Sequence, residues 1–72
     1  MKQKIFDMEN IILQLIELRD NLRTKVRECD KLRKSYEAQG EYLTARNYSL
    51  MKGTFEYSLD EVEKILKLNV AP

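Results

Sequence analysis

Hydrophobic residues recur every three or four positions along the first half of the chain. They are Met8, Ile11, Leu15, Leu18, Leu22, Val26, Cys29, Leu32 and Tyr36. A mean spacing of about 3.5 residues is typical of the seam of a long amphipathic helix with coiled-coil character. No glycine or proline precedes Gly40. The pattern therefore predicts a helix over about residues 3–38.

The same spacing returns in the second half and predicts a second helix over about residues 41–69. Its positions are Ala45, Tyr48, Met51, Phe55, Leu59, Val62, Leu66 and Val70. Gly53 and Thr54 lower the helix propensity, and residues 58–61 match a capping box, so three alternatives stay open. The helix continues with Gly53 at a close packing point, it breaks near residues 53–58, or residues 48–57 form a short β-hairpin. The unbroken spacing through Phe55 favours the continuous helix.

Gly40 lies between the two periodic segments and is followed by Glu41. Glycine adopts the left-handed conformation that ends many helices at no steric cost, and a carboxylate suits the start of the next helix. We therefore expect a bend over about residues 39–41. Residues 1–72 are predicted to form a single all-α domain, a long antiparallel helical hairpin.

The spacing Tyr36, Gly40, Tyr42, Ala45 also resembles the turn between the two helices of a tetratricopeptide repeat. The resemblance covers about ten residues, and it fails at Arg33 and Lys52, where the repeat has small residues. There is also no second copy of the pattern. The resemblance therefore implies the geometry of the turn and no peptide-binding function.

Charge gives a second argument for the hairpin. A fold at residues 39–40 brings together positions whose numbers sum to about 79. The expected cross-helix pairs are Arg19 with Asp60, Arg23 with Glu56, and Glu17 with Lys64. The signs are complementary, and such exposed pairs select a register more than they stabilise it.

Both helices carry more apolar residues than a single partner helix covers. Beside the seam lie Ile5, Phe6, Ile12, Leu13 and Ile16, and then Leu43, Leu50, Tyr57, Ile65 and Leu68. A chain this short buries only about 60% of its unfolded surface and usually needs a disulfide, a metal or a partner subunit.

With one cysteine and no histidine, the sequence leaves the partner subunit as the expected solution. We predict self-association at the end away from the bend, most simply as a dimer that forms a four-helix bundle. The residues expected to carry it are Ile5, Ile12, Ile16, Ile65 and Leu68. A helix from another protein would satisfy the same surface.

Candidate catalytic chemistry is sparse. The chain has no histidine, no cysteine pair and no phosphate-binding loop, so we expect no enzymatic activity, no cofactor, no metal and no small-molecule substrate. The carboxylates at residues 56, 60, 61 and 63 are interpreted as a solvated helix face. Cys29 lies at a seam position, where a thiol packs as a small apolar group.

From the charge, the apolar runs and the single cysteine we expect a cytoplasmic location. The net charge is +1, no apolar run is long enough for a membrane span, and Asp7 and Glu9 interrupt what would be a secretory signal. The lone thiol fits a reducing compartment. The usage of Lys, Ile, Asn and Tyr favours a bacterial or phage source.

Positive charge collects towards the bend, since residues 25–52 hold seven basic and four acidic side chains. Tyrosines beside arginines can stack on unpaired bases, and regulators of plasmid copy number of the Rop type are dimers of helical hairpins that bind RNA. The residues expected to contact an external partner are Arg33, Lys34, Tyr42 and Arg46. Two functions therefore stay open: a protein-interaction and assembly element, or an RNA- or DNA-binding hairpin.

Overall fold

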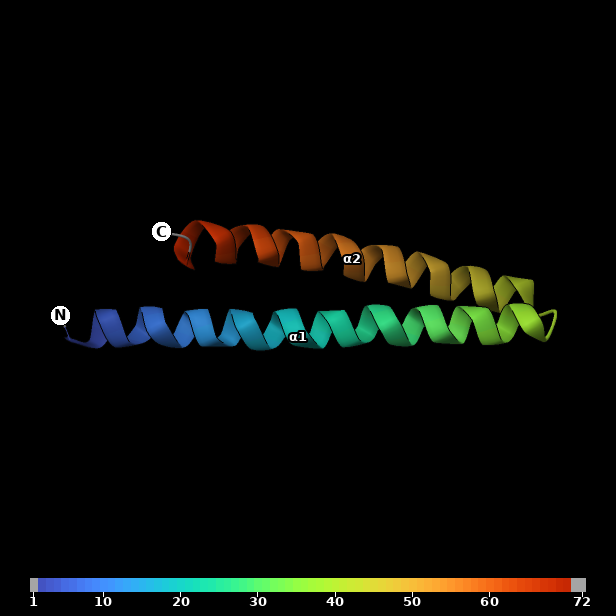
Figure 1. Cartoon of the computed structure of the whole chain (residues 1–72), viewed down its shortest axis with the longest axis horizontal. Helices are drawn as coiled ribbons and strands as arrows, with labels where there is room; N and C mark the ends of the chain where they lie inside the picture. The colour runs from blue at the N-terminus through green and yellow to red at the C-terminus, as the bar shows by residue number, and fades with distance from the viewer. Residues whose placement is uncertain (1, 71–72) are drawn as a thin grey trace.

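Two long helices make up the described part of the chain. The computed structural model describes the backbone of residues 2–70 and the side chains of residues 8–68. Helix α1 (Lys2–Ala38) and helix α2 (Tyr42–Val70) pack antiparallel (Figure 1). The fold is the predicted helical hairpin, 58 Å long. The helices lie closest at the bend and diverge towards the termini, which we call the open end (Figure 1).

The bend is a Schellman turn built on Gly40. Gly40 has a φ of 80°, its N–H donates to the Glu37 carbonyl at 3.0 Å, and the Glu41 N–H donates to the Tyr36 carbonyl at 2.9 Å. These two bonds satisfy carbonyls that the end of α1 would otherwise leave unpaired. The Glu41 carbonyl then accepts the first bond of α2, from the Ala45 N–H at 3.0 Å. Gly40 therefore caps the end of α1, and Glu41, directly after it, caps the start of α2.

Helix α2 runs without a break through Gly53. Of the three alternatives for this segment, the structure has the continuous helix, but Gly53 is not a close packing point within the hairpin. A Cβ at Gly53 would meet no atom within 4 Å. The Thr54 hydroxyl donates to the Leu50 carbonyl at 3.1 Å, a local bond that helices tolerate. The capping-box match at residues 58–61 starts no helix.

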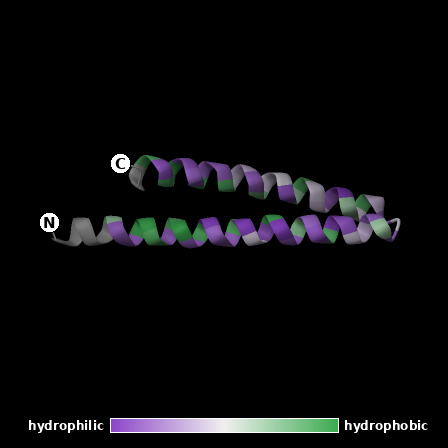
Figure 2. Ribbon diagram, viewed as in Figure 1, coloured by the Kyte–Doolittle hydropathy of each residue, from purple (hydrophilic) through white to green (hydrophobic). Residues whose placement is uncertain are grey.

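The core is small and lies nearer the open end than the bend. Leu22, Val62 and Leu66 are buried together. Half-buried residues pack around them: Ile12, Leu15, Ile16, Phe55 and Leu59. Cys29 and Ala45 are the buried residues nearer the bend. The hydropathy of α1 follows this division, because its strongly hydrophobic stretch lies in the half that faces the open end (Figure 2).

The seam of α1 differs from the predicted one at several positions. Leu18 and Leu32 are 44% and 40% exposed, whereas the neighbouring Arg19 and Arg33 are half-buried. In α2, Met51 is exposed and Lys52 takes its place. Long basic side chains can lie along an interface with the stem buried and the charge at its edge. The observed seams are residues 12, 15, 19, 22, 26, 29, 33 and 36 of α1 and residues 45, 48, 52, 55, 59, 62 and 66 of α2.

The three predicted cross-helix ion pairs are wrong. All six side chains are described, and Arg19 pairs with Asp20 at 3.2 Å, while Lys64 pairs with Asp60 and Glu61. Arg23 reaches Glu63 at 4.0 Å instead of Glu56.

The reason is the register. The Tyr36 and Tyr48 rings stack with centroids 5.6 Å apart, so facing positions sum to about 84. The seam of α2 begins at Ala45, after the exposed Tyr42 and Leu43. The sum of facing positions therefore rises from about 79 to about 84, which is somewhat more than one helical turn of about 3.6 residues.

Candidate functional site

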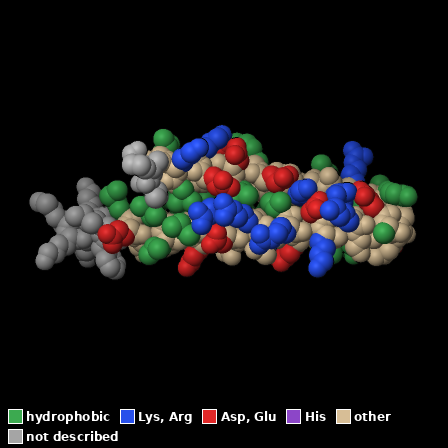
Figure 3. Space-filling model, viewed as in Figure 1, with side chains coloured by type: hydrophobic (Ala, Val, Ile, Leu, Met, Phe, Trp, Pro, Cys, Tyr) green, Lys and Arg blue, Asp and Glu red, His purple; other side chains and the backbone are tan. Residues whose placement is uncertain are grey.

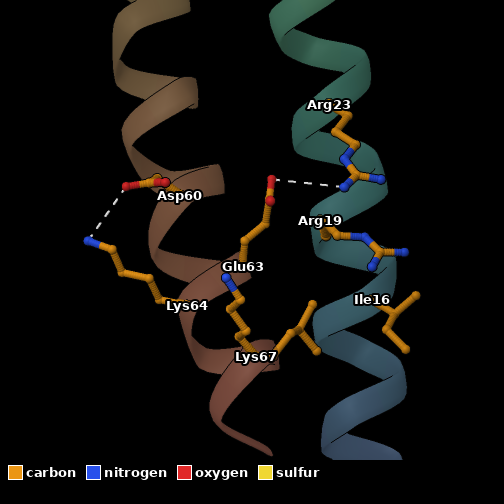
Figure 4. A pocket seen from close by; sticks show the side chains of 8 residues that line it. Ile16, Arg19, Arg23, Asp60, Glu63, Lys64 and Lys67 are labelled. Atoms are coloured by element: carbon orange, nitrogen blue, oxygen red, sulfur yellow. Dashed lines mark ion pairs between the residues drawn. The ribbon is translucent and has the colours of Figure 1, made fainter. Parts of the chain in front are cut away.

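A groove lies between the helices near the open end (Figure 4). It has a volume of about 630 Å³. Its lining residues are Ile16, Arg19, Arg23, Asp60, Glu63, Lys64, Leu66 and Lys67. Arg23 approaches Glu63 across the groove, and Asp60 pairs with Lys64 at 3.5 Å on its own helix. The lining holds four basic and two acidic side chains, and Arg23 and Lys64 each pair with an acidic residue of the lining.

Three basic residues nearer the bend converge on one carboxylate. Asp30 accepts from Lys52 at 3.0 Å, from Arg33 at 3.1 Å and from Lys34 at 3.1 Å. These hydrogen bonds, that from Lys52 first, hold the pKa of the Asp30 carboxyl well below its usual value. Arg33 also donates to Glu37 at 2.9 Å. Its pKa is raised by the bond to Asp30 and then by that to Glu37.

Two of the four residues predicted to contact an external partner are therefore engaged within the chain, namely Arg33 and Lys34. The other two, Tyr42 and Arg46, lie one helical turn apart near the start of α2 and are exposed, Tyr42 by 71%. Tyr36 and Tyr48 stack on each other, so these two rings already have an aromatic partner. Lys34 remains 67% exposed in spite of its pair with Asp30, so the accessible part of the predicted contact is Lys34, Tyr42 and Arg46.

The residues predicted to carry self-association fall into three environments. Ile12 and Ile16 are half-buried against the core cluster. Ile65 is 43% exposed and Leu68 is 84% exposed. Ile5 lies outside the residues whose side chains the structure describes. These side chains therefore do not form one continuous exposed surface.

The two long sides of the hairpin differ in polarity. Arg23 directly follows Leu22 of the α1 seam, and Glu63 directly follows Val62 of the α2 seam, so their contact places both on one side. Charged side chains cover the middle of the face shown in Figure 3. Residues that directly precede seam positions then lie on the opposite side. We call that side the apolar flank; its exposed large hydrophobic members are Ile11, Leu18, Leu32, Met51 and Ile65.

The apolar flank is interrupted at its middle. Lys25 occupies the flank position between Leu18 and Leu32, seven residues from each, and it is exposed. Sequence reasoning missed this flank because it assigned Leu18 and Leu32 to the seam. The half-buried Arg19 and Arg33 show that the seam passes through these two positions and that Leu18 and Leu32 belong to the flank.

A second apolar surface runs along the back of α2. Leu43, Leu50 and Tyr57 follow one another at intervals of seven residues and are 81%, 63% and 69% exposed. Leu50 and Tyr57 each lie two residues from seam positions on both sides, about 200° around the helix. They therefore point away from α1. We call this surface the α2 ridge, and it contains no charged residue between Leu43 and Tyr57 along that line.

Comparisons with known proteins assign no relative. No protein-family model, no curated protein and no solved structure matches the chain. In the described residues, neither helix has an apolar stretch that would cross a membrane. The same residues hold no cluster of three or more potential metal ligands. The inference of function therefore depends on the surfaces of the hairpin itself.

Proposed function

We propose that the chain is a non-enzymatic helical interaction element that acts by self-association through its exposed apolar surface. The observation that carries the proposal is the imbalance between core and surface. Among the described side chains, five hydrophobic residues are buried, whereas twelve large ones are exposed. Fully burying one such side chain is worth about 1.5 to 3 kcal/mol, so covering several would add as much stability as a small domain has in total.

The simplest assembly contains two hairpins and four helices. A dimer with two-fold symmetry repeats every contact and covers both copies of the apolar surface at once. Docking of helices would supply the affinity, and the charge pattern beside the apolar residues would set the register.

Unfolding at different protein concentrations tests the proposal. If the folded state is a dimer, each tenfold increase in concentration stabilises it by about 1.4 kcal/mol per mole of dimer, so the urea midpoint rises. We expect this rise by circular dichroism in the micromolar range. A midpoint that does not move with concentration would show that the hairpin is stable alone, and it would refute self-association as the function.

Binding of RNA or DNA is the alternative, and it has less support because Arg33 and Lys34 are paired with Asp30. Its accessible residues are Lys34, Tyr42 and Arg46. A fluorescence titration with a single-stranded oligonucleotide tests it: affinity that falls steeply with salt and is lost in Arg46→Glu would establish nucleic-acid binding. The interaction-element proposal expects no binding above that of an unrelated protein of similar charge.

A further inference from the structure

We propose that the dimer contact is the α2 ridge, with Leu50 of each copy inserted into a recess on α2 of the other. This inference rests on the proposed function, since it names the surface that self-association uses. It commits to a second copy of this chain as the occupant. Two features of α2 that the hairpin itself leaves without a role support it: a glycine in mid-helix and a cation without an ion pair.

The recess lies between Leu50 and Tyr57. Four residues at positions i, i+3, i+4 and i+7 form the hole that accepts one side chain of a facing helix. On the ridge these are Leu50, Gly53, Thr54 and Tyr57. The two middle residues are small, and a Cβ at Gly53 would enter open space. The hole is therefore deep, with a large apolar side chain at each end.

The floor of the recess can lose its water at little cost. The Thr54 hydroxyl already donates to the Leu50 carbonyl at 3.1 Å, so its proton needs no solvent partner, and its methyl group remains for contact. The backbone N–H groups here are bonded within the continuous helix. A leucine that enters the recess thus leaves no buried donor unpaired.

A two-fold axis makes this contact reciprocal. When Leu50 of one copy lies opposite the middle of residues 53–54 of the other, facing positions on antiparallel α2 helices sum to about 104. Leu50 of the second copy then enters the recess of the first. A single leucine and a single recess on each chain are sufficient, which is the requirement for a closed dimer.

Charge in the same register is complementary. Arg46, Gly53 and Asp60 follow one edge of the ridge at intervals of seven residues. Position 46 lies opposite position 58 of the second copy, about 3 Å along the axis from its Asp60. Arg46 makes no ion pair within the described residues, and Asp60 shares Lys64 with Glu61. The register therefore brings a cation without an ion pair to a carboxylate on both sides of the axis.

The apolar flank is the less suitable surface because Lys25 lies at its middle. Two-fold pairing about that point would bring two ammonium groups together, and buried like charges oppose association. The ridge has no such interruption. In this register residues 42–62 of the two α2 helices face each other, so the contact is about 10 Å wide and roughly 30 Å long, which is smaller than a standard specific interface. We therefore expect affinity in the micromolar range and a row of four helices with the two α2 helices in the middle.

Sedimentation equilibrium on four chains tests the inference: the unmodified protein, Leu50→Glu, Gly53→Ala, and Leu18→Glu on the apolar flank. We expect Leu50→Glu to weaken dimerisation by about 100-fold or more, because both copies lose the inserted leucine and gain a carboxylate near the axis. Leu18→Glu is the matched control and should leave the dissociation constant within about threefold. Circular dichroism checks that each variant is helical.

The Gly53→Ala variant distinguishes the loss of a specific dimer contact from a general loss of helix stability. Alanine raises helix propensity at an exposed position, so in the Leu50→Glu background the variant should unfold at higher urea. In the unmodified background it fills the recess and should weaken the dimer by about tenfold. A dimer that Gly53→Ala strengthens or leaves unchanged would overturn the inference.

The outcomes also separate this inference from the proposed function. A dimer that Leu18→Glu dissociates and Leu50→Glu does not would place the contact on the apolar flank, which refutes the ridge and keeps self-association. An unmodified chain that stays monomeric at all concentrations would refute both.

Discussion

Replacing Gly40 by alanine isolates the contribution of the turn to the stability of the hairpin. Gly40 has a φ of 80°, and an added Cβ would meet no atom within 4 Å. The cost is therefore one of backbone conformation and not of steric contact with neighbours. Placing a non-glycine residue in the left-handed region costs about 1 to 2 kcal/mol, and the lower entropy of the unfolded alanine chain returns about 0.4 to 1 kcal/mol.

The net expectation for Gly40→Ala is a loss of about 1 kcal/mol, which lowers the melting temperature of a domain of this size by about 4 to 8 °C. Urea unfolding by far-UV circular dichroism, at one protein concentration for all variants, measures it. Gly40→Asn is the matched control, because asparagine tolerates this conformation, and it should retain most of the stability. A Gly40→Ala chain as stable as the unmodified one would show that the Schellman turn does not contribute as the hydrogen bonds from Gly40 and Glu41 indicate.

Two further substitutions test the core and the charged cluster. Leu22→Ala should lower the free energy of unfolding by about 2 to 4 kcal/mol because it opens a cavity beside Val62 and Leu66. The control Leu68→Ala, at an 84% exposed position, should change the free energy of unfolding by less than about 0.5 kcal/mol. Equal effects of the two variants in urea titrations would contradict the packing of Leu22 in the core. Asp30 has a pKa lowered from 3.8 by its hydrogen bonds, so its contribution is complete above about pH 4 and decreases as the pH falls further. When the pH is lowered from neutral to below 4, the Asp30→Asn variant should therefore lose less free energy of unfolding than the unmodified chain does. If urea unfolding shows the same loss for both chains, the ion pairs of Asp30 do not contribute to folding.

The sequence was sufficient for the hairpin and insufficient for its register. A glycine between two runs of apolar residues at helical spacing specifies a turn, and Gly40 has the expected left-handed conformation. The seam was harder, because Ile11, Leu18 and Leu32 form one apolar line, and Ile12, Arg19 and Arg33 form the next line, one position away. Hydrophobicity favours the first line, but the folded chain uses the second, in which Arg19 and Arg33 are half-buried.

The pairing of the basic residues was also not evident from local sequence. Arg33 and Lys34 lie three and four residues from Asp30, which is visible on a helical projection, but Lys52 is twenty-two positions away and reaches Asp30 only in the folded hairpin. A charge count over residues 25–52 therefore gave a more accessible basic region than the structure has. For the α2 ridge, the seven-residue spacing of Leu43, Leu50 and Tyr57 is visible in the sequence. That these residues are exposed follows only from the packing of α2 against α1.

Self-association is tested most directly by the mass of the unmodified chain in solution. Light scattering on a size-exclusion column, over a dilution series from high to low micromolar concentration and at two salt concentrations, gives that mass. The account predicts about twice 8.6 kDa at the highest concentrations, with a fall towards the monomer on dilution. A mass of 8.6 kDa at every concentration and salt would contradict it.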